Sequence, residues 1–233
     1  MFNFIFGYES QRRRQLKKVA AAPLKQYLAT PFPDLKTPID RVPILALDFE
    51  TTGLNAKTDH ILSIGYVAID GLAIQLESAH HQIIHTIGDL REESVIVHHI
   101  TDDKKSRGLP IAEVMPRLLE AMCGRVLLVH YAHIEKGFLR QICQQLYGLA
   151  PVLPIIDTLV IARKRLDQRT TLYSPGDLRL FNLRQRHNLP RYRAHNALSD
   201  AIATAELFFA ELELKKYTTP PPLKSLIQQP WSR

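Results

Sequence analysis

The chain has 233 residues, of which 45% are hydrophobic and 23% charged, with a net charge of +7 and a pI of about 9.5. This length predicts one ordinary domain with added segments, and the composition is typical of a globular protein. No apolar run approaches the roughly 18 residues of a membrane-spanning helix. Met1–Phe6 precedes its arginines, the reverse of a secretory signal. We therefore expect a cytoplasmic protein without a membrane partner.

The excess of basic residues favours a polyanionic partner, because Lys and Arg side chains that neutralise phosphates supply most non-specific affinity for nucleic acids. Cys123 and Cys143 lack the spacing of a metal site and fall in apolar helical patterns. They predict buried free thiols in a reducing compartment. The pairs His80–His81 and His98–His99 have no second pair at zinc-finger spacing, so we expect no structural zinc.

Three segments are predicted along the chain. Residues 1–40 form a basic helical N-terminal extension, in which Gln11 to Leu28 has helix-forming composition and three prolines then end the helix. Residues 41–215 hold the main domain. Residues 216–233 form an extended C-terminal tail, and the stretch from Leu223 onward is expected to be a solvent-exposed, disordered end.

The main domain is predicted to open with three strands, at about 43–50, 61–69 and 72–85, which form an antiparallel meander. A helix should begin at Pro110, and Pro116 within it implies a kink or a later start. The later elements are a strand at 125–130, a helix at 135–146, a strand ending at 157, and helices at 177–187 and 197–214. Strands with interleaved helices predict a mixed α/β sheet.

The first strand carries two carboxylates, Asp48 and Glu50, close to its C-terminal end. Side chains two residues apart in a strand project from the same face. Two adjacent buried acids are very costly without a partner, and a divalent cation with oxygen ligands is the least expensive one. The alternative is that the two acids mark the wet face of an edge strand.

Three further groups of polar residues lie at strand ends or helix starts. Glu135 follows the strand at 125–130 and begins a helix, Asp157 ends the next strand, and His195 precedes Asp200 in the first turn of the last helix. An acid in the first turn of a helix is also favoured by the helix dipole alone, which is the structural alternative for Glu135 and Asp200.

These motifs together resemble the DEDDh 3′–5′ exonucleases, the DnaQ-like family whose best-known member is the epsilon subunit of bacterial DNA polymerase III. The resemblance covers roughly residues 43 to 214. It rests on Asp48-Phe-Glu-Thr-Thr-Gly53, Val97-His-His-Ile-Thr101, His130 to Leu139, Asp157-Thr158 and His195-Asn-Ala-Leu-Ser-Asp200. It implies a ribonuclease H-like fold, with three antiparallel strands, then parallel strands, and helices on both sides.

The second motif departs from the family pattern, which reads His-Asn-Ala-x-Phe-Asp. Here Tyr131 replaces the Asn and Glu135 replaces the Asp. The longer carboxylate side chain alters the geometry, and catalytic sites tolerate only about half an ångström of slack. We expect that activity is retained, but that it is weaker than usual for the family or biased toward Mn²⁺. The alternative is a degenerate site in which Glu135 is a salt-bridging helix residue.

The resemblance implies hydrolysis of phosphodiester bonds at 3′ ends of DNA with two divalent ions, Mg²⁺ or Mn²⁺, and release of nucleoside 5′-monophosphates. Asp48 would bridge both ions, Glu50 and Asp200 would each hold one, and Glu135 would bind directly or through water. His195 would be the general base. By the same resemblance, Thr51, Thr52, Gly53 and Leu54 would contact the terminal nucleotide, with His98 lining the same pocket.

Two alternative functions stay open at this point. One is an RNA-trimming exoribonuclease of the same family, because a contact to a 2′-hydroxyl cannot be recognised in the sequence. The other is a degenerate module that binds nucleic acid or a polymerase without cutting. A DNA polymerase or a sliding clamp is a candidate partner, and the tail with Trp231 is a candidate docking segment.

Overall fold

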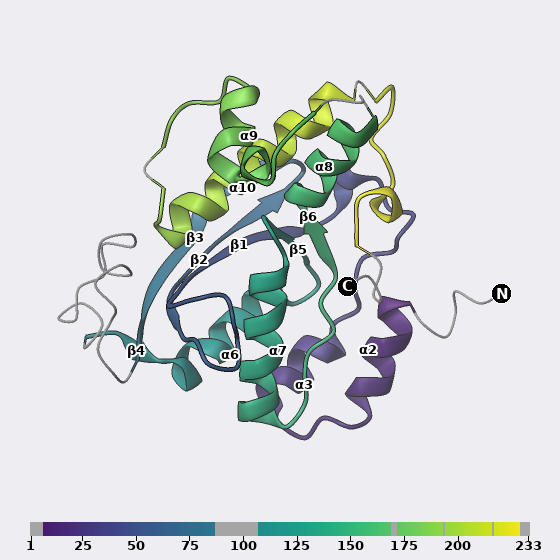
Figure 1. Cartoon of the computed structure of the whole chain (residues 1–233). Helices are drawn as coiled ribbons and strands as arrows, with labels where there is room; N and C mark the ends of the chain where they lie inside the picture. Colours follow the sequence, from purple (N-terminus) through teal and green to yellow (C-terminus); the bar gives the residue numbers. More distant parts are fainter. Residues whose placement is uncertain (1–6, 87–106, 169–171, 193, 216, 229–233) are drawn as a thin grey trace.

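The computed structural model describes residues 7–86, 107–168, 172–192, 194–215 and 217–228, and its centre is one six-stranded sheet (Figure 1). The strand order is β4-β3-β2-β1-β5-β6. The strands are β1 Ile44–Thr51, β2 Ile61–Asp70, β3 Ala73–His85, β4 Leu109–Pro110, β5 Val126–Val129 and β6 Ile155–Asp157. β1, β2 and β3 pair antiparallel, and β5 and β6 continue from β1 in parallel. The predicted mixed α/β fold is confirmed, and among the described strands the two-residue β4 at the sheet edge was not predicted.

Strand β1 lies inside the sheet and is buried on both faces. Leu45 and Leu47 belong to one hydrophobic cluster, and Ile44 and Ala46 belong to another. This alternation is the two-residue period of a strand between two packed layers. The alternative of an exposed edge strand is therefore wrong.

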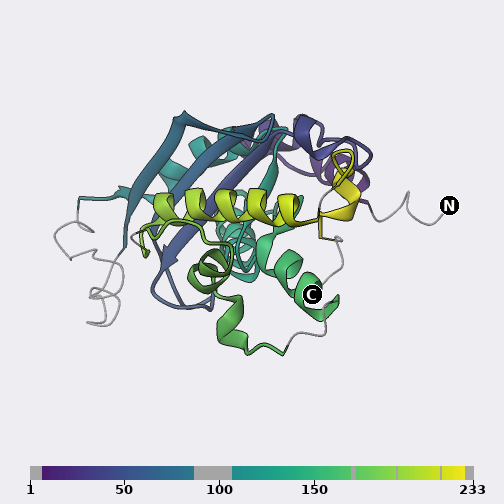
Figure 2. The ribbon, with the colours of Figure 1, turned by 90° about the horizontal axis from the view of Figure 1, so that it is seen from above.

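Helices cover both faces of the sheet. α3 Ala22–Ala29, α6 Ile111–Met122 and α7 His133–Tyr147 cover one face, and α10 Ala197–Leu214 crosses the other (Figure 2). α8 Thr158–Gln168 and α9 Leu180–Arg186 pack beside α10. α6 begins at Ile111 and contains Pro116, so the predicted start near Pro110 is confirmed and the alternative of a later start is wrong. The helix α8 was not predicted, and the helix expected at 177–187 is a short 3₁₀ turn, Pro175–Leu178, followed by α9.

The N-terminal extension consists of two helices, α2 Tyr8–Leu16 and α3, instead of one continuous helix over Gln11 to Leu28. Both pack onto the main domain. Tyr27 of α3 is fully buried and its hydroxyl donates a hydrogen bond to the carbonyl of Val152 at 2.7 Å. Both cysteines are free, as predicted, with Cys143 buried and Cys123 partly buried.

The C-terminal segment up to Gln228 packs against the sheet, so the expectation of an exposed end from Leu223 is wrong for these residues. Leu223, Leu226 and Ile227 are buried. Ile227 bridges Ile156 of β6, and the Gln228 amide donates to the Ile155 carbonyl at 2.8 Å. The outer edge of β6 needs hydrogen-bond partners, and the tail supplies them. Trp231 lies outside the described residues. Within the described ranges no helix is both long and apolar enough to span a bilayer.

Candidate active site

Strand β1 delivers two carboxylates to the face of the sheet that α10 covers. Asp48 and Glu50 share this face with Ile44 and Ala46, both fully buried, and Glu50 is only 5% exposed. In the antiparallel register, Asp48 stands opposite Gly65 of β2. The pairing shifts between Glu50 and Thr51, where the strand ends.

Helix α10 begins directly against this part of the sheet because Gly65 has no side chain. A Cβ atom on Gly65 would lie 2.1 Å from the amide nitrogen of Leu198 and 2.2 Å from the carbonyl carbon of Ala197. Asn196 caps the helix by accepting a hydrogen bond from the Ser199 amide at 3.1 Å. A glycine inside a strand often marks such a close approach of two backbones. Here it brings Asp200, in the first turn, to Asp48.

Asp48, Glu50 and Asp200 form a compact acidic cluster, in which one carboxylate oxygen from each residue lies within 4.8 Å of the other two. Within the described ranges it is the one group of this kind. Burial, followed by the charges of Glu135, Asp200 and Glu50, raises the pKa of Asp48 well above its ordinary value. Burial is also the main cause that raises the pKa of Asp200 to about 6, although a hydrogen bond from Tyr192 opposes it. The cluster therefore needs positive charge in order to be fully ionised near neutral pH.

Glu135 lies beside this cluster but outside the group of three. It is 2% exposed in the first turn of α7, and its Oε2 has no hydrogen-bond partner among the described residues. Burial raises the pKa of Glu135 to about 8, partly offset by the backbone amides of Glu135 itself and of Phe49. The charge of Glu135 in turn raises the pKa of Asp48. A buried carboxylate with an unused oxygen suits a cation or its bound water better than a salt bridge on the helix surface.

The three cluster acids and Glu135 have the chemistry needed to hold divalent cations, the cofactor expected from the family resemblance. Carboxylate oxygens are the ligands that Mg²⁺ and Mn²⁺ prefer. Oδ1 of Asp200, like Oε2 of Glu135, is buried without a hydrogen-bond partner in the described part of the chain. Oxygens left unpaired in this way are expensive unless a ligand occupies the space between them.

His195 stands at the rim of the cluster. Its side chain is exposed, and its backbone lies in the left-handed region at φ +66° just before the N-cap of α10. Its amide donates a hydrogen bond to Oδ2 of Asp200 at 3.1 Å. A histidine with positive φ is uncommon and is frequently associated with functional sites.

The turn before α7 is held by Asp157 and not by the acidic cluster. The Asp157 carboxylate accepts hydrogen bonds from the amides of Tyr131 at 3.0 Å and Ala132 at 2.9 Å, and from the Gln228 side chain at 3.1 Å. His130 contacts the Thr158 hydroxyl at 2.8 Å. Asp157 and His130 thus position the start of α7, and with it Glu135. The role of Gln228 was missed because it lies in the tail.

The last residue of β1 and the turn after it carry the four residues expected to contact substrate. The Thr51 hydroxyl donates to the Gly53 carbonyl at 2.8 Å, and the Thr52 hydroxyl accepts from the His60 amide at 2.9 Å. Leu54, at the tip of the turn, is 66% exposed. His98, expected in the same pocket, lies outside the described residues.

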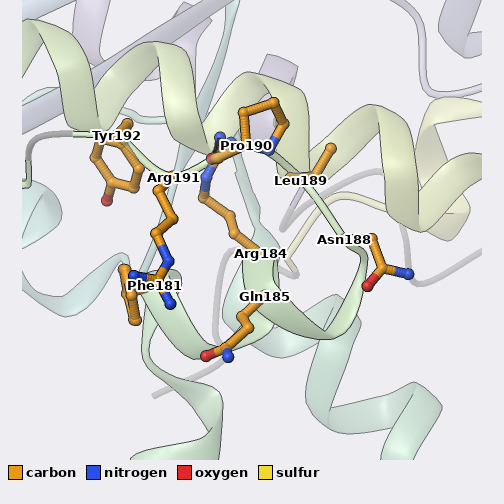
Figure 3. Close-up of a pocket in the computed structure, with 8 residues that line it drawn as sticks. All are labelled: Phe181, Arg184, Gln185, Asn188, Leu189, Pro190, Arg191 and Tyr192. Atoms are coloured by element: carbon orange, nitrogen blue, oxygen red, sulfur yellow. Dashed lines mark hydrogen bonds between the residues drawn. The ribbon is translucent and has the colours of Figure 1, made fainter.

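The segment between α9 and His195 is anchored by Arg184, which sequence reasoning did not identify. Figure 3 shows Arg184 reaching from α9 to the chain that runs through Pro190 to Tyr192, beside a hollow of about 220 Å³. Its guanidinium donates to the carbonyls of Ala203 at 2.9 Å and Pro190 at 3.0 Å, and lies 4.9 Å from the centre of the Tyr192 ring. Burial and the charge of Asp200 raise the pKa of the Tyr192 hydroxyl. Tyr192 is thus a neighbour of the acidic cluster.

The chain matches the family model described as "Exonuclease" over residues 45–208. It is similar to DNA polymerase III PolC-type of Thermotoga maritima, at 33% identity over 172 residues, which are 74% of this chain and 12% of that protein. It is also similar to DNA polymerase III subunit epsilon of Treponema pallidum, at 27% identity over 82% of this chain and 89% of that protein.

Solved structures with the same fold include the nuclease domain of 3′hExo, a DEDDh family member bound to rAMP. The identity is 16%, the TM-score is 0.63, and the match covers 82% of this chain and 98% of that domain. The chain spans only about an eighth of the length of the PolC-type relatives. The match over most of the chain shows that this protein belongs to the exonuclease family, of the DnaQ-like, DEDDh type.

Proposed function

We propose that this nuclease hydrolyses phosphodiester bonds one at a time from the 3′ end of single-stranded or frayed DNA and releases nucleoside 5′-monophosphates. The observation that carries the proposal is the acidic cluster, in which residues 48, 50 and 200 meet within 4.8 Å. The family match supports the reaction class. E. coli exonuclease I, which shares this fold at a TM-score of 0.61 and 15% identity, has been solved with a 5cy-dT13 oligonucleotide.

In the proposed site, Asp48, Glu50 and Asp200 hold divalent cations, and Glu135 contributes directly or through a water. When bound, two such ions supply Lewis-acid stabilisation of charge on the phosphate and lower the pKa of a water. The carboxylates would otherwise repel the phosphate, so the negative cluster alone binds no substrate.

His195 is proposed as the general base that takes a proton from the attacking water. Its side chain is exposed, and its backbone amide donates a hydrogen bond to Asp200 of the acidic cluster. Histidine is the side chain that most often serves as a general base in enzymes. The turn of Thr51, Thr52 and Gly53 would bind the terminal nucleotide, with Leu54 against its base.

A panel of substrates tests this proposal. DNA and RNA, single- and double-stranded and labelled at the 3′ end, would be incubated with Mg²⁺, Mn²⁺ or EDTA, with Asp48→Asn as the inactive control. Metal-dependent release of labelled mononucleotides from DNA supports the proposal. Binding without release would instead support a degenerate module, and faster release from RNA would support an exoribonuclease, consistent with the ribonucleotide in the 3′hExo structure.

Association with a DNA polymerase is proposed on the relatives alone, which are polymerase III proteins. A co-purification experiment with the replicative polymerase of the source organism would test it.

A further inference from the structure

Asp200 receives hydrogen bonds from two donors that lie outside the acidic cluster. The His195 amide donates to Oδ2 at 3.1 Å, and the hydroxyl of Tyr192 bonds to the same carboxylate. Oδ1 is buried and has no hydrogen-bond partner among the described residues. The two donors therefore limit the rotation of the carboxylate and leave Oδ1 available to a cation.

The ring of Tyr192 rests on a buried arginine. The guanidinium of Arg184 lies 4.9 Å from the centre of the ring and donates to the carbonyl of Pro190, two positions earlier in the chain, at 3.0 Å (Figure 3). The Arg184 side chain is 3% exposed, and the attraction between a cation and an aromatic face is stronger when the pair is desolvated. Arg184 therefore holds both the ring and the backbone that carries it.

Arg184 is itself tied to the helix that carries Asp200. Its guanidinium donates to the Ala203 carbonyl at 2.9 Å and pairs with the Glu206 carboxylate at 2.6 Å. Both residues lie within two turns of Asp200 on α10. The tyrosine and the carboxylate that it contacts are thus positioned by the same helix.

A tyrosine suits this position better than a cationic side chain does. A phenolic hydroxyl keeps its proton near neutral pH and donates one hydrogen bond without carrying charge. Arg165 shows the contrast, since it neutralises Glu211 through two hydrogen bonds at 2.8 and 2.9 Å. Tyr192 therefore orients Asp200 and leaves its negative charge to a metal ion.

We propose that Tyr192 is a positioning residue for the metal site: its hydroxyl fixes the carboxylate of Asp200, and Arg184 acts by fixing Tyr192. Loss of a donor that orients a ligating carboxylate typically costs about 10–100-fold in metal affinity or activity. This inference rests on the proposed function, in which Asp200 holds a divalent cation. It goes beyond that function because it assigns roles to two residues outside the acidic cluster.

The test is the affinity for Mn²⁺ in the absence of substrate, measured from the paramagnetic resonance signal of the free ion. Tyr192→Phe removes the hydroxyl and keeps the ring on Arg184, so the affinity should fall about 10–100-fold. The matched control is Tyr27→Phe, which removes a buried hydroxyl 2.7 Å from the Val152 carbonyl, on the other face of the sheet. The control should keep the wild-type affinity, and thermal melting verifies that both variants are folded.

A second comparison tests the part of Arg184. Arg184→Lys keeps a positive charge but loses the planar group that covers the ring and bonds to two carbonyls. It should weaken Mn²⁺ binding in the wild-type chain and have little further effect when combined with Tyr192→Phe, because it acts through the tyrosine hydroxyl. Equal losses in both backgrounds would remove Arg184 from the proposed role.

Wild-type Mn²⁺ affinity in the Tyr192→Phe variant would overturn the proposal. So would an equal loss in the Tyr27→Phe control, which would trace the effect to general stability. The measurement needs no turnover. If the wild-type chain binds Mn²⁺ but releases no nucleotide from any substrate, the proposed function fails, while the comparison of variants still decides the role of Tyr192. A wild-type chain that binds no Mn²⁺ would overturn both.

Discussion

Gly65→Ala is predicted to disable the candidate site without touching any of its carboxylates. The added Cβ would lie 2.1 Å from the amide nitrogen of Leu198, whereas ordinary contacts begin at about 3.4 Å. The backbone atoms that it meets belong to the start of α10, and they cannot rotate away as a side chain could. The first turn of α10 must therefore move by about 1.3 Å, and Asp200 moves with it.

A displacement of this size is large compared with what a catalytic site tolerates. Functional geometry usually has to be held within about 0.5 Å, and a misplacement of about 1 Å can reduce the rate about 10²-fold. Overpacking of a well-packed interior costs about 1–3 kcal/mol. In a chain of this length, that cost corresponds to roughly 2–4 °C of melting temperature per kcal/mol.

The assay is metal-dependent release of nucleotides from single-stranded DNA, together with thermal melting and far-UV circular dichroism. Gly176→Ala is the matched control, because its Cβ would lie 3.6 Å from the Ser174 hydroxyl oxygen, an ordinary contact. We expect the Gly65 variant to stay folded and to lose about 10²-fold in rate. Wild-type turnover in the folded Gly65 variant would refute the argument that this close approach places Asp200.

His195→Ala should lower turnover by about 10²–10⁴ with DNA binding retained, measured by steady-state kinetics and fluorescence anisotropy. The exposed His85→Ala is its control, and unchanged turnover would remove His195 from the proposed role. Metal removal should make stability depend on pH, because burial raises the pKa of Glu135 to about 8 from 4.5 in the unfolded chain. The folded protein holds the Glu135 proton more tightly than the unfolded chain does. The stability that this proton contributes is fully present below pH 4.5 and is lost as the pH rises through about 8. Melting temperatures in EDTA should fall over this range, and they should fall less steeply in Glu135→Gln, which cannot lose a proton there; an unchanged slope in that variant would contradict the assignment. Leu223→Ala should cost about 2–5 kcal/mol because this leucine is fully buried, whereas Leu172→Ala, at 99% exposure, should melt like the wild type; equal melting of the two variants would show that the tail does not stabilise the fold.

The elements that the sequence predicted well are those with a strong internal period. β1 alternates between two buried faces, and α10 carries its apolar residues at helical spacing, so both were expected close to their observed positions. The order and spacing of Asp48 and Glu50 on β1 and of Asp200 on α10 could be matched to the motifs of a known family. Their convergence, however, depends on Gly65, whose importance arises from α10, a helix that begins 132 positions later in the chain.

The missed elements owe their stability to partners distant in sequence. Helix α8 has many basic residues and a weak apolar side, so its sequence looks like a charged surface segment. Its Arg165 is buried because Glu211 of α10 accepts two hydrogen bonds from it, at 2.8 and 2.9 Å. Arg165 and Glu211 are 46 positions apart, and no local pattern connects them. The tail was misjudged for the same reason, since only the open edge of β6 explains why its leucines are buried.

Gln228 connects both ends of the chain to the turn that opens α7. The Tyr8 hydroxyl donates to the Gln228 carbonyl at 2.7 Å, while the Gln228 side chain donates to Asp157, which also holds the amides of Tyr131 and Ala132. Proteolysis or truncation before this glutamine would therefore remove a hydrogen bond that anchors the start of helix α2 and, at the same time, loosen the carboxylate that orients the first residues of α7. Limited digestion of the C-terminal segment should consequently lower nuclease activity, although the cut lies far in sequence from the acidic cluster.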